Sequence, residues 1–255
     1  MKIEVLGCSG AKFPGHNTPA FMIGKEILFD AGTISGVLNE KQQLKIKYIF
    51  ITHAHLDHIW SIPFLADNIN VGQNEHRVTI FSIAPVINTI KKHLFNSSVW
   101  PDFTLIPDPD NAVLNFMALK PGKPLSMNGY SITPYRVPHT VPAVGYLIQD
   151  RKSRRVFYTG DMGSSEDIWK KVGDVRIDCL IIDVSFPNGL KDMAVKTGHL
   201  TPELLQHELL KMSAPPESVC IAHIKPQYFK KIKEELKRLK IKNLKVLRDG
   251  DTIRV

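Results

Sequence analysis

The segment His53-Ala54-His55-Leu56-Asp57-His58 directly follows the apolar, β-branched run of residues 46–52 and is the most informative motif of the chain. Three histidines and one aspartate lie within these six residues, at a spacing suited to metal ligation. In an extended loop His53 and His55 project to the same side, whereas Asp57 and His58 can turn toward a second point at the start of a following helix. Burying these groups together would be costly unless a cation compensated them, so the motif predicts a metal site. A solvated, histidine-rich turn is the alternative.

Isolated residues further along the chain are candidates for the remaining ligands. Each lies just past the end of an apolar run: His139, Asp161 and His223 follow residues 131–137, 156–159 and 219–222. The ends of strands are where open α/β sheets place their binding sites. One such residue alone could equally cap an element or lie on the surface, but the shared placement of these residues favours metal ligation.

The rest of the chain alternates between strand-like and helix-like patterns. Apolar runs rich in β-branched residues predict strands at residues 3–6, 27–29, 46–52, 78–83, 131–137, 144–148, 156–159, 180–184, 219–222 and 245–247. Apolar residues at helical spacing, with Pro85 and the Thr201-Pro202 pair as start signals, predict helices at residues 85–94, 202–209 and 229–239. Interleaved strands and helices predict a mixed α/β fold whose sheets are covered by helices.

The predicted domain organisation is simple. No Ser/Gly-rich linker divides the 255 residues, so a single domain over residues 1–255 is expected. The weakest pattern lies at residues 96–123, where several prolines and Asn/Asp turn residues indicate an inserted loop region. Loops of that length are usually functional or mobile.

The composition is that of a globular protein. Hydrophobic residues make up 43% and charged residues 23%, which argues against disorder and low-complexity structure. No apolar run approaches the roughly 20 residues of a membrane-spanning helix, and Glu4 stands where a signal peptide would be apolar. A cytoplasmic protein without a membrane partner is therefore expected. Cys8, Cys179 and Cys220 are predicted to be reduced, buried thiols.

The chain is basic, with a formal net charge of +8. Lysines and arginines cluster in residues 225–238 and just beyond, opposite the apolar residues of the predicted C-terminal helix. A basic balance favours an anionic substrate or polymer, but a solvated, lysine-rich helix face gives the same net charge. The second interpretation carries more weight, so charge alone does not indicate nucleic acid.

The motif HAHLDH, followed by isolated His, Asp and His in that order, resembles the metallo-β-lactamase superfamily. The resemblance implies a four-layer αββα sandwich with a dinuclear metal centre at the edge of its two sheets. It also implies that His53, His55 and His139 hold one metal, that Asp57, His58 and His223 hold the other, and that Asp161 bridges them. Zn²⁺ suits such a set of two divalent ions, and Mn²⁺ or Fe would also accept it.

Other motifs indicate the branch of the superfamily. Asp161 stands where the lactamase branch has a cysteine, which resembles the phosphodiesterase and RNA-processing branches. Segments 6–10, 16–18 and 28–32 are similar to the opening of ribonuclease Z, the transfer-RNA 3′-end nuclease, and of cyclic-nucleotide phosphodiesterases. Segments 100–103, 182–188 and 198–202 look most like class II cyclic-nucleotide phosphodiesterases. The chain departs from these families at Trp60-Ser61-Ile62, where a glycine usually follows the motif.

The resemblance implies a metal-dependent phosphodiesterase that opens a small cyclic nucleotide, 3′,5′-cyclic AMP or GMP, to the nucleoside monophosphate. The two cations would share a hydroxide as nucleophile and clamp the phosphodiester oxygens. A ribonuclease Z acting on transfer-RNA precursors is the second interpretation, although no Lys-rich protruding arm is evident in the sequence. A non-catalytic metal-binding module is the third. The oligomeric state is open, with a homodimer as one option.

Candidate catalytic residues are His199 and Asp57. His199 is the candidate proton donor to the leaving alkoxide, because an imidazole can donate a proton near neutral pH; its alternative role is that of a helix-entry residue. Asp30 and Asp183 are expected to accept hydrogen bonds from the far ring nitrogens of ligand histidines. Each could equally be a turn residue at the end of a strand.

Two aromatic residues are candidates for substrate binding. Trp100 and Phe103 would stack on a nucleobase at the mouth of the site, or else anchor a long loop as ordinary apolar residues. The remaining histidines are expected to be structural or solvated, with the loop residue His16 as the strongest exception: His16, His76, His93 and His207.

Overall fold

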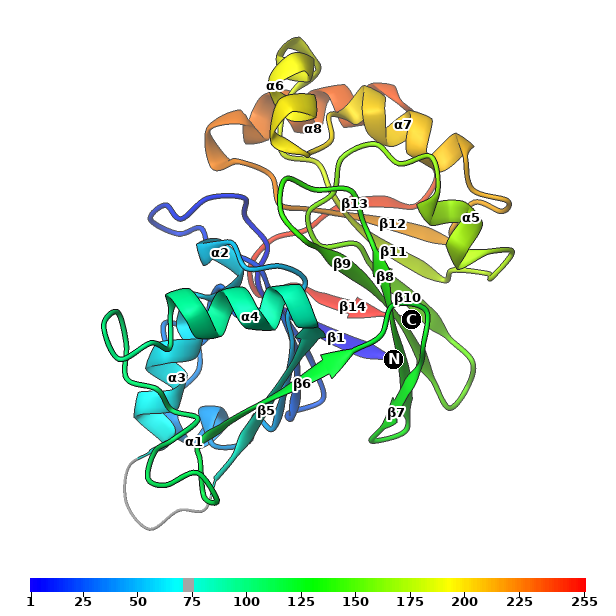
Figure 1. The fold of residues 1–255 in the computed structure, drawn as a ribbon. Helices are drawn as coiled ribbons and strands as arrows, with labels where there is room; N and C mark the ends of the chain where they lie inside the picture. Colours follow the sequence, from blue (N-terminus) through cyan, green and yellow to red (C-terminus); the bar gives the residue numbers. More distant parts are fainter. Residues whose placement is uncertain (71–75) are drawn as a thin grey trace.

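A computed structural model of the chain describes residues 1–70 and 76–255, and in these residues two seven-stranded sheets lie between layers of helices (Figure 1). The first sheet has the order β14 (Thr252–Arg254), β1 (Lys2–Gly7), β2 (Ala20–Ile23), β3 (Ile27–Phe29), β4 (Tyr48–Phe50), β5 (Val78–Ile83) and β6 (Leu114–Leu119). The second has the order β13 (Leu244–Val246), β12 (Ser218–Ala222), β11 (Cys179–Asp183), β10 (Arg155–Tyr158), β9 (Val144–Asp150), β8 (Tyr130–Arg136) and β7 (Leu125–Met127).

Helices cover the outer face of each sheet. Figure 1 shows α1 (Glu40–Gln43), α2 (Leu56–Ile59), α3 (Ser61–Ile69) and α4 (Ala84–His93) on the side of the first sheet. On the side of the second sheet lie α5 (Ile168–Val172), α6 (Lys191–Thr197), α7 (Pro202–Leu210) and α8 (Phe229–Arg238). Short 3₁₀ turns at η1 (Asn188–Leu190) and η2 (Pro226–Tyr228) precede α6 and α8. This is the predicted four-layer αββα sandwich.

The direction of the strands determines where the site lies. Strands β3 to β6 run parallel to one another, and so do β10 to β13. Strand β9 is antiparallel to both β8 and β10, so β8 runs in the same direction as β10. The carboxyl ends of β4, β8, β10 and β12 therefore each point toward one edge of their sheet. The segments that follow these strands carry the predicted metal ligands.

Aromatic rings fill the space between the sheets. Phe50 stacks on Phe29 and on Phe81, with ring centroids 5.1 and 4.8 Å apart. Tyr146 of the second sheet contacts Phe50 edge-on at 5.6 Å and donates a 2.7 Å hydrogen bond from its hydroxyl to the carbonyl of Ile51. Since Ile51 immediately follows β4, this buried bond fixes the chain just before the HAHLDH motif.

All of the predicted strands and helices are present, and Thr201 caps α7 by accepting a hydrogen bond from the amide of Leu204. Strands β2, β6, β7 and β14 are additional. The loop region predicted at residues 96–123 is too long, because residues 114–119 form β6, which pairs with β5 along its whole length. Its sequence alternates weakly because β6 is a partly exposed edge strand, and the surrounding prolines dominate the pattern.

The cysteines and the basic residues of α8 lie in opposite environments. Cys8, Cys179 and Cys220 are buried and unpaired, as predicted. Helix α8 buries Ile232 and Leu236 and turns its lysines outward, so its basic face is solvated. Among the residues that the structure describes, no helix has both the length and the apolar character needed to cross a bilayer.

Candidate metal centre

The predicted ligands converge at one edge of the sandwich. The loop after β4 and the start of α2 supply His53, His55, Asp57 and His58, and the segments after β8, β10 and β12 supply His139, Asp161 and His223. The site therefore lies between the sheets, with each sheet contributing part of it. Their ligand atoms form two overlapping groups, and within each group all atoms lie within 4.8 Å of one another.

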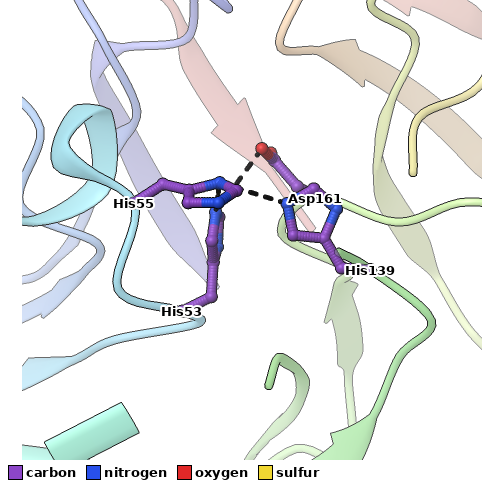
Figure 2. A group of neighbouring side chains, drawn as sticks. All are labelled: His53, His55, His139 and Asp161. Atoms are coloured by element: carbon purple, nitrogen blue, oxygen red, sulfur yellow. Dashed lines mark hydrogen bonds and ion pairs between the residues drawn. The ribbon is translucent and has the colours of Figure 1, made fainter. Parts of the chain in front are cut away.

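The first group consists of His53, His55, His139 and Asp161, whose side chains face one another in Figure 2. The Nδ1 atom of His55 lies 3.0 Å from Nε2 of His53 and 3.2 Å from Nε2 of His139. Oδ2 of Asp161 lies 3.7 Å from Nε2 of His53. Three imidazole nitrogens and one carboxylate oxygen thus enclose a single point.

The second group consists of Asp57, His58, His223 and the same Asp161. Nε2 of His223 lies 3.2 Å from Oδ2 of Asp57, 3.4 Å from Nε2 of His58 and 3.3 Å from Oδ2 of Asp161. Oδ1 of Asp161 lies 3.3 Å from Nε2 of His58. Asp161 therefore belongs to both groups, in the position of a bridge.

The chemistry of these groups fits divalent cations. Burial lowers the pKa of His53 well below its ordinary value and also lowers those of His55 and His139, so these rings are neutral and offer lone pairs. Burial alone would raise the pKa of Asp161, but His223 and His58 lower it well below the usual range. Its Oδ1 atom is buried without a hydrogen-bond partner among the described residues. A bound cation would satisfy that oxygen.

His58 lies in the most acidic part of the site. Burial alone would lower its pKa, but the carboxylates of Asp161, Asp30 and Asp57 raise it well above the ordinary value. A proton on His58 and a cation in the second group would compete for the same Nε2 lone pair. Metal binding at this group is therefore expected to release a proton.

Hydrogen bonds behind the ligands fix their ring orientation. Nδ1 of His58 donates to Asp30 at 2.8 Å, and Asp30 also accepts from the amide of Thr52 at 2.8 Å and from the hydroxyl of Tyr158 at 2.6 Å. Nδ1 of His139 donates to the carbonyl of Gly198 at 2.9 Å. With the proton on Nδ1 in both rings, Nε2 is left to bind a metal. Asp30 thus lies where the sequence analysis places it.

Asp183 and His199 form a pair beside the second group. Nδ1 of His199 lies 2.7 Å from Oδ2 of Asp183, and the His199 ring stacks on His223 with centroids 5.3 Å apart. Asp183 reaches His223 through Ser185, whose hydroxyl donates to Asp183 at 2.7 Å and accepts from Nδ1 of His223 at 2.8 Å. Burial alone would lower the pKa of His199, but Asp183 raises it above its ordinary value.

Some residues around the site are not anticipated from the sequence. Thr52 and Ser185 lie next to predicted residues, which is a weak signal, whereas Tyr158 is indistinguishable from a core aromatic residue of a strand. Gly198 has a φ of +69°, and a Cβ atom there would lie 2.9 Å from Nδ1 of His139. Only glycine combines this backbone conformation with the close approach of the imidazole.

The predicted substrate residues are placed differently. Phe103 is 2% exposed and belongs to the core, so the prediction that its ring stacks on a base is wrong: the core encloses the ring. Trp100 is half-buried, and its ring packs edge-on against Phe64 with ring centroids 5.4 Å apart. Its role in substrate binding remains a prediction. Trp60 has right-handed helical dihedral angles, which explains why this chain needs no glycine after the motif.

The remaining histidines lie outside the ligand groups. His76 bonds to the carbonyl of Ile46 at 2.8 Å, and His93 and His207 are exposed. His16 lies in the loop between β1 and β2 and contacts the hydroxyl of Ser9 at 3.4 Å.

The family is decided by a match over most of the chain. Residues 25–224 match the family model described as the β-lactamase superfamily domain. The chain belongs to the metallo-β-lactamase superfamily. Membership of this superfamily, together with the His/Asp cluster, supports a metal-dependent hydrolase.

Relatives within the superfamily have two kinds of name. The chain is 28% identical to a 3′,5′-cyclic-nucleotide phosphodiesterase of Aliivibrio fischeri, over 86% of this chain and 80% of that protein. It is 25% identical to ribonuclease Z of Archaeoglobus fulgidus, over 90% of this chain and 89% of that protein. It spans 58% of the length of a Yersinia pestis protein named "Probable 3′,5′-cyclic-nucleotide phosphodiesterase" and 50% of the length of 3′,5′-cyclic-nucleotide phosphodiesterase 1 of Saccharomyces cerevisiae.

A solved structure has the same fold. Unliganded yeast PDE1 superposes with a TM-score of 0.81 at 20% sequence identity, over 98% of each chain. At this identity the likeness concerns the fold alone.

Proposed function

We propose that this superfamily member is a phosphodiesterase that hydrolyses a small cyclic nucleotide to the nucleoside monophosphate. The observation that carries the proposal is the shared carboxylate of Asp161 between two ligand groups, with the His199–Asp183 pair stacked beside the second group. When bound, two divalent cations lower the pKa of water to near neutrality and polarise a phosphoryl group. The two ligand groups of the candidate metal centre, which share Asp161, would hold these cations.

His199 has the arrangement of a proton donor. Its Nδ1 atom is held by Asp183, the described residues offer no hydrogen-bond partner to its Nε2 atom, and Asp183 raises its pKa, which favours the protonated ring at neutral pH. Opening a cyclic phosphodiester expels an alkoxide, which needs a proton. We assign that transfer to Nε2 of His199. Asp57, at the other end of the second group, would act by holding a cation and orienting His223 through their 3.2 Å contact.

The test of His199 uses two leaving groups. The substitution His199→Ala is expected to lower kcat for 3′,5′-cyclic AMP by roughly 10²- to 10⁴-fold, because general acid catalysis is typically of that size. The loss should be far smaller for bis(p-nitrophenyl) phosphate, since p-nitrophenolate leaves without protonation. The exposed His207→Ala is the matched control. Equal losses on both substrates would show that His199 is not the acid.

The substrate class is tested with a panel. Metal analysis of the purified protein should give about two divalent ions per chain, and Asp161→Asn should lower both metal content and turnover. Among 3′,5′-cyclic AMP, 3′,5′-cyclic GMP, 2′,3′-cyclic AMP and a transfer-RNA precursor, we expect the 3′,5′-cyclic nucleotides to be preferred, with weak salt dependence. Metal binding without cleavage of any diester would instead indicate a non-catalytic module.

A transfer-RNA 3′-end nuclease is the second candidate. The near-complete alignment with ribonuclease Z of Archaeoglobus fulgidus and the net charge of +8 favour it. Against it, no segment of the described residues extends as a separate arm from the sandwich (Figure 1). Preference for the precursor RNA, with activity falling steeply as salt rises, would promote this candidate.

A further inference from the structure

A cavity of about 380 Å³ lies beside the metal centre but contains none of its proposed ligands. Its lining includes Ser9, His16, Ile224, Phe229, Arg248 and the carboxylate-bearing Asp249. It adjoins the centre through the main chain, because the amide of His223 donates to the carbonyl of Cys8 at 2.7 Å and Ile224 is the next residue. A cavity of this size is large enough for one small molecule.

The walls of the cavity are held in place by hydrogen bonds. The loop between β1 and β2 is tied down by a 2.8 Å bond from the amide of Ser9 to the carbonyl of Asn17 and a 3.0 Å bond from the amide of Gly10 to the carbonyl of Ile224. The carboxylate of Asp249 accepts from the amides of Asn17 at 2.7 Å and Cys8 at 3.2 Å. The cavity is thus a preformed feature of the fold.

Part of the cavity lining is apolar. Ile221, Ile224 and Leu247 form this part together with the ring of Phe229. Such a surface suits a flat, weakly polar group such as a nucleobase, which gains from stacking on an aromatic ring. The imidazole of His16 and the hydroxyl of Ser9, 3.4 Å apart, supply hydrogen-bonding groups in the same cavity.

A positive charge lies against the same aromatic ring. The guanidinium of Arg248 lies 5.7 Å from the ring centroid of Phe229 and forms no ion pair with any residue that the structure describes. Two neighbouring carboxylates have other partners: Asp249, which also lines the cavity, accepts from the loop amides, and Asp251 accepts from the amide of Arg248 and from Lys245, both at 3.0 Å. A guanidinium that stacks on an aromatic ring and forms no ion pair keeps its N–H donors for paired hydrogen bonds to a phosphate.

The positive charge continues outside the cavity. A neighbouring depression of about 420 Å³ shares Phe229 and Arg248 with the cavity and is lined by Lys233, Lys237, Lys240 and Lys245. These lysines make the electrostatic potential around Arg248 more favourable for anions. The cavity and its rim thus combine apolar, hydrogen-bonding and cationic side chains.

We propose that this cavity is a second binding site, separate from the metal centre, that takes a nucleoside monophosphate. The base would lie against Phe229 and the apolar side chains, and the phosphate would lie on Arg248. The choice of a nucleotide rests on the proposed function, since such a molecule is its product. The site itself rests on the cavity and its charge.

The experiment measures binding rather than turnover. Isothermal titration of the full chain, as purified and after treatment with chelator, is carried out with AMP, adenosine and inorganic phosphate. AMP is expected to bind in both preparations and at least tenfold more tightly than adenosine or phosphate. Retained binding after chelation separates this site from the metal centre, so failure of the proposed hydrolysis would leave this result unaffected.

Variants locate the ligand. Arg248→Gln is expected to weaken AMP binding at least tenfold, and Phe229→Leu to weaken AMP and adenosine while leaving phosphate unchanged. Arg238→Gln, an exposed arginine of α8 outside both hollows, is the matched control, and Asp161→Asn should keep AMP binding. Thermal melting checks that each variant is folded. AMP binding that is absent at millimolar concentration, lost equally in Asp161→Asn, or unaffected by Arg248→Gln would overturn the proposal.

Discussion

At the scale of single residues, Asp30 joins the metal centre to the core. It is fully buried, and its carboxylate accepts from His58, Thr52 and Tyr158. Asp30→Asn removes the charge and replaces one acceptor by a donor, so we expect it to weaken metal binding roughly 10- to 100-fold. Competition with a chelating dye measures the affinity, and the exposed Asp174→Asn is the control. Unchanged affinity would show that Asp30 only supports packing.

At the scale of elements, α8 depends on its narrow apolar face. Ile232 and Leu236 are buried, whereas Lys237 is exposed. Leu236→Ala should lower the free energy of unfolding by about 2 to 5 kcal/mol, the usual cost of such a cavity, and Lys237→Ala should change it by less than about 0.5 kcal/mol. Urea denaturation of both variants measures the difference. Similar values for both would mean that α8 is not packed as described.

The hairpin between β9 and β10 gives an element-scale prediction about pH. Burial alone would raise the pKa of Asp150, but hydrogen bonds from the Arg154 side chain and from the amides of Arg154 and Lys152 lower it from 3.8 to about 2. A lowered folded-state pKa means that the charged carboxylate stabilises the fold above about pH 4 and that this contribution is lost as the pH falls toward 2. In urea denaturation at pH 6, the free energy of unfolding of the wild type should exceed that of Asp150→Asn. The difference between the two should shrink at low pH. A difference in the free energy of unfolding that does not change with pH would contradict the lowered pKa of Asp150.

At the scale of the whole molecule, the metal centre joins the two sheets. Its first part follows β4, and His139, Asp161 and His223 follow strands of the second sheet. Metal at a hundredfold excess over its Kd stabilises the fold by about 3 kcal/mol, so chelation should lower Tm by roughly 5 to 10 °C for a chain of this size. Calorimetry with and without chelator tests this, and Asp161→Asn should respond much less. An unchanged Tm after proven metal loss would count against the proposed centre.

The sequence predicts best those parts of the fold and the site whose residues are contiguous or mark the end of a strand. Residues 53–58 are contiguous, and His139, Asp161 and His223 each mark the end of a strand, so their convergence follows from strand direction. The contact between Tyr158 and Asp30 joins residues far apart in the chain and leaves no local pattern. Phe103 illustrates the opposite difficulty, because an aromatic residue in a proline-rich loop has the same sequence signature whether it is buried or exposed. Strands β7 and β14 are too short for any periodicity to be detected.

The pairing of β14 with β1 also has a consequence for biosynthesis. Ile3 is aligned with Ile253, so the outermost strand of the first sheet comes from the part of this sequence that is translated last. While the ribosome is still producing α7 and α8, the backbone of β1 has an uncovered edge open to other nascent chains. We therefore expect the first sheet to be completed only after residues 252–254 have left the ribosome.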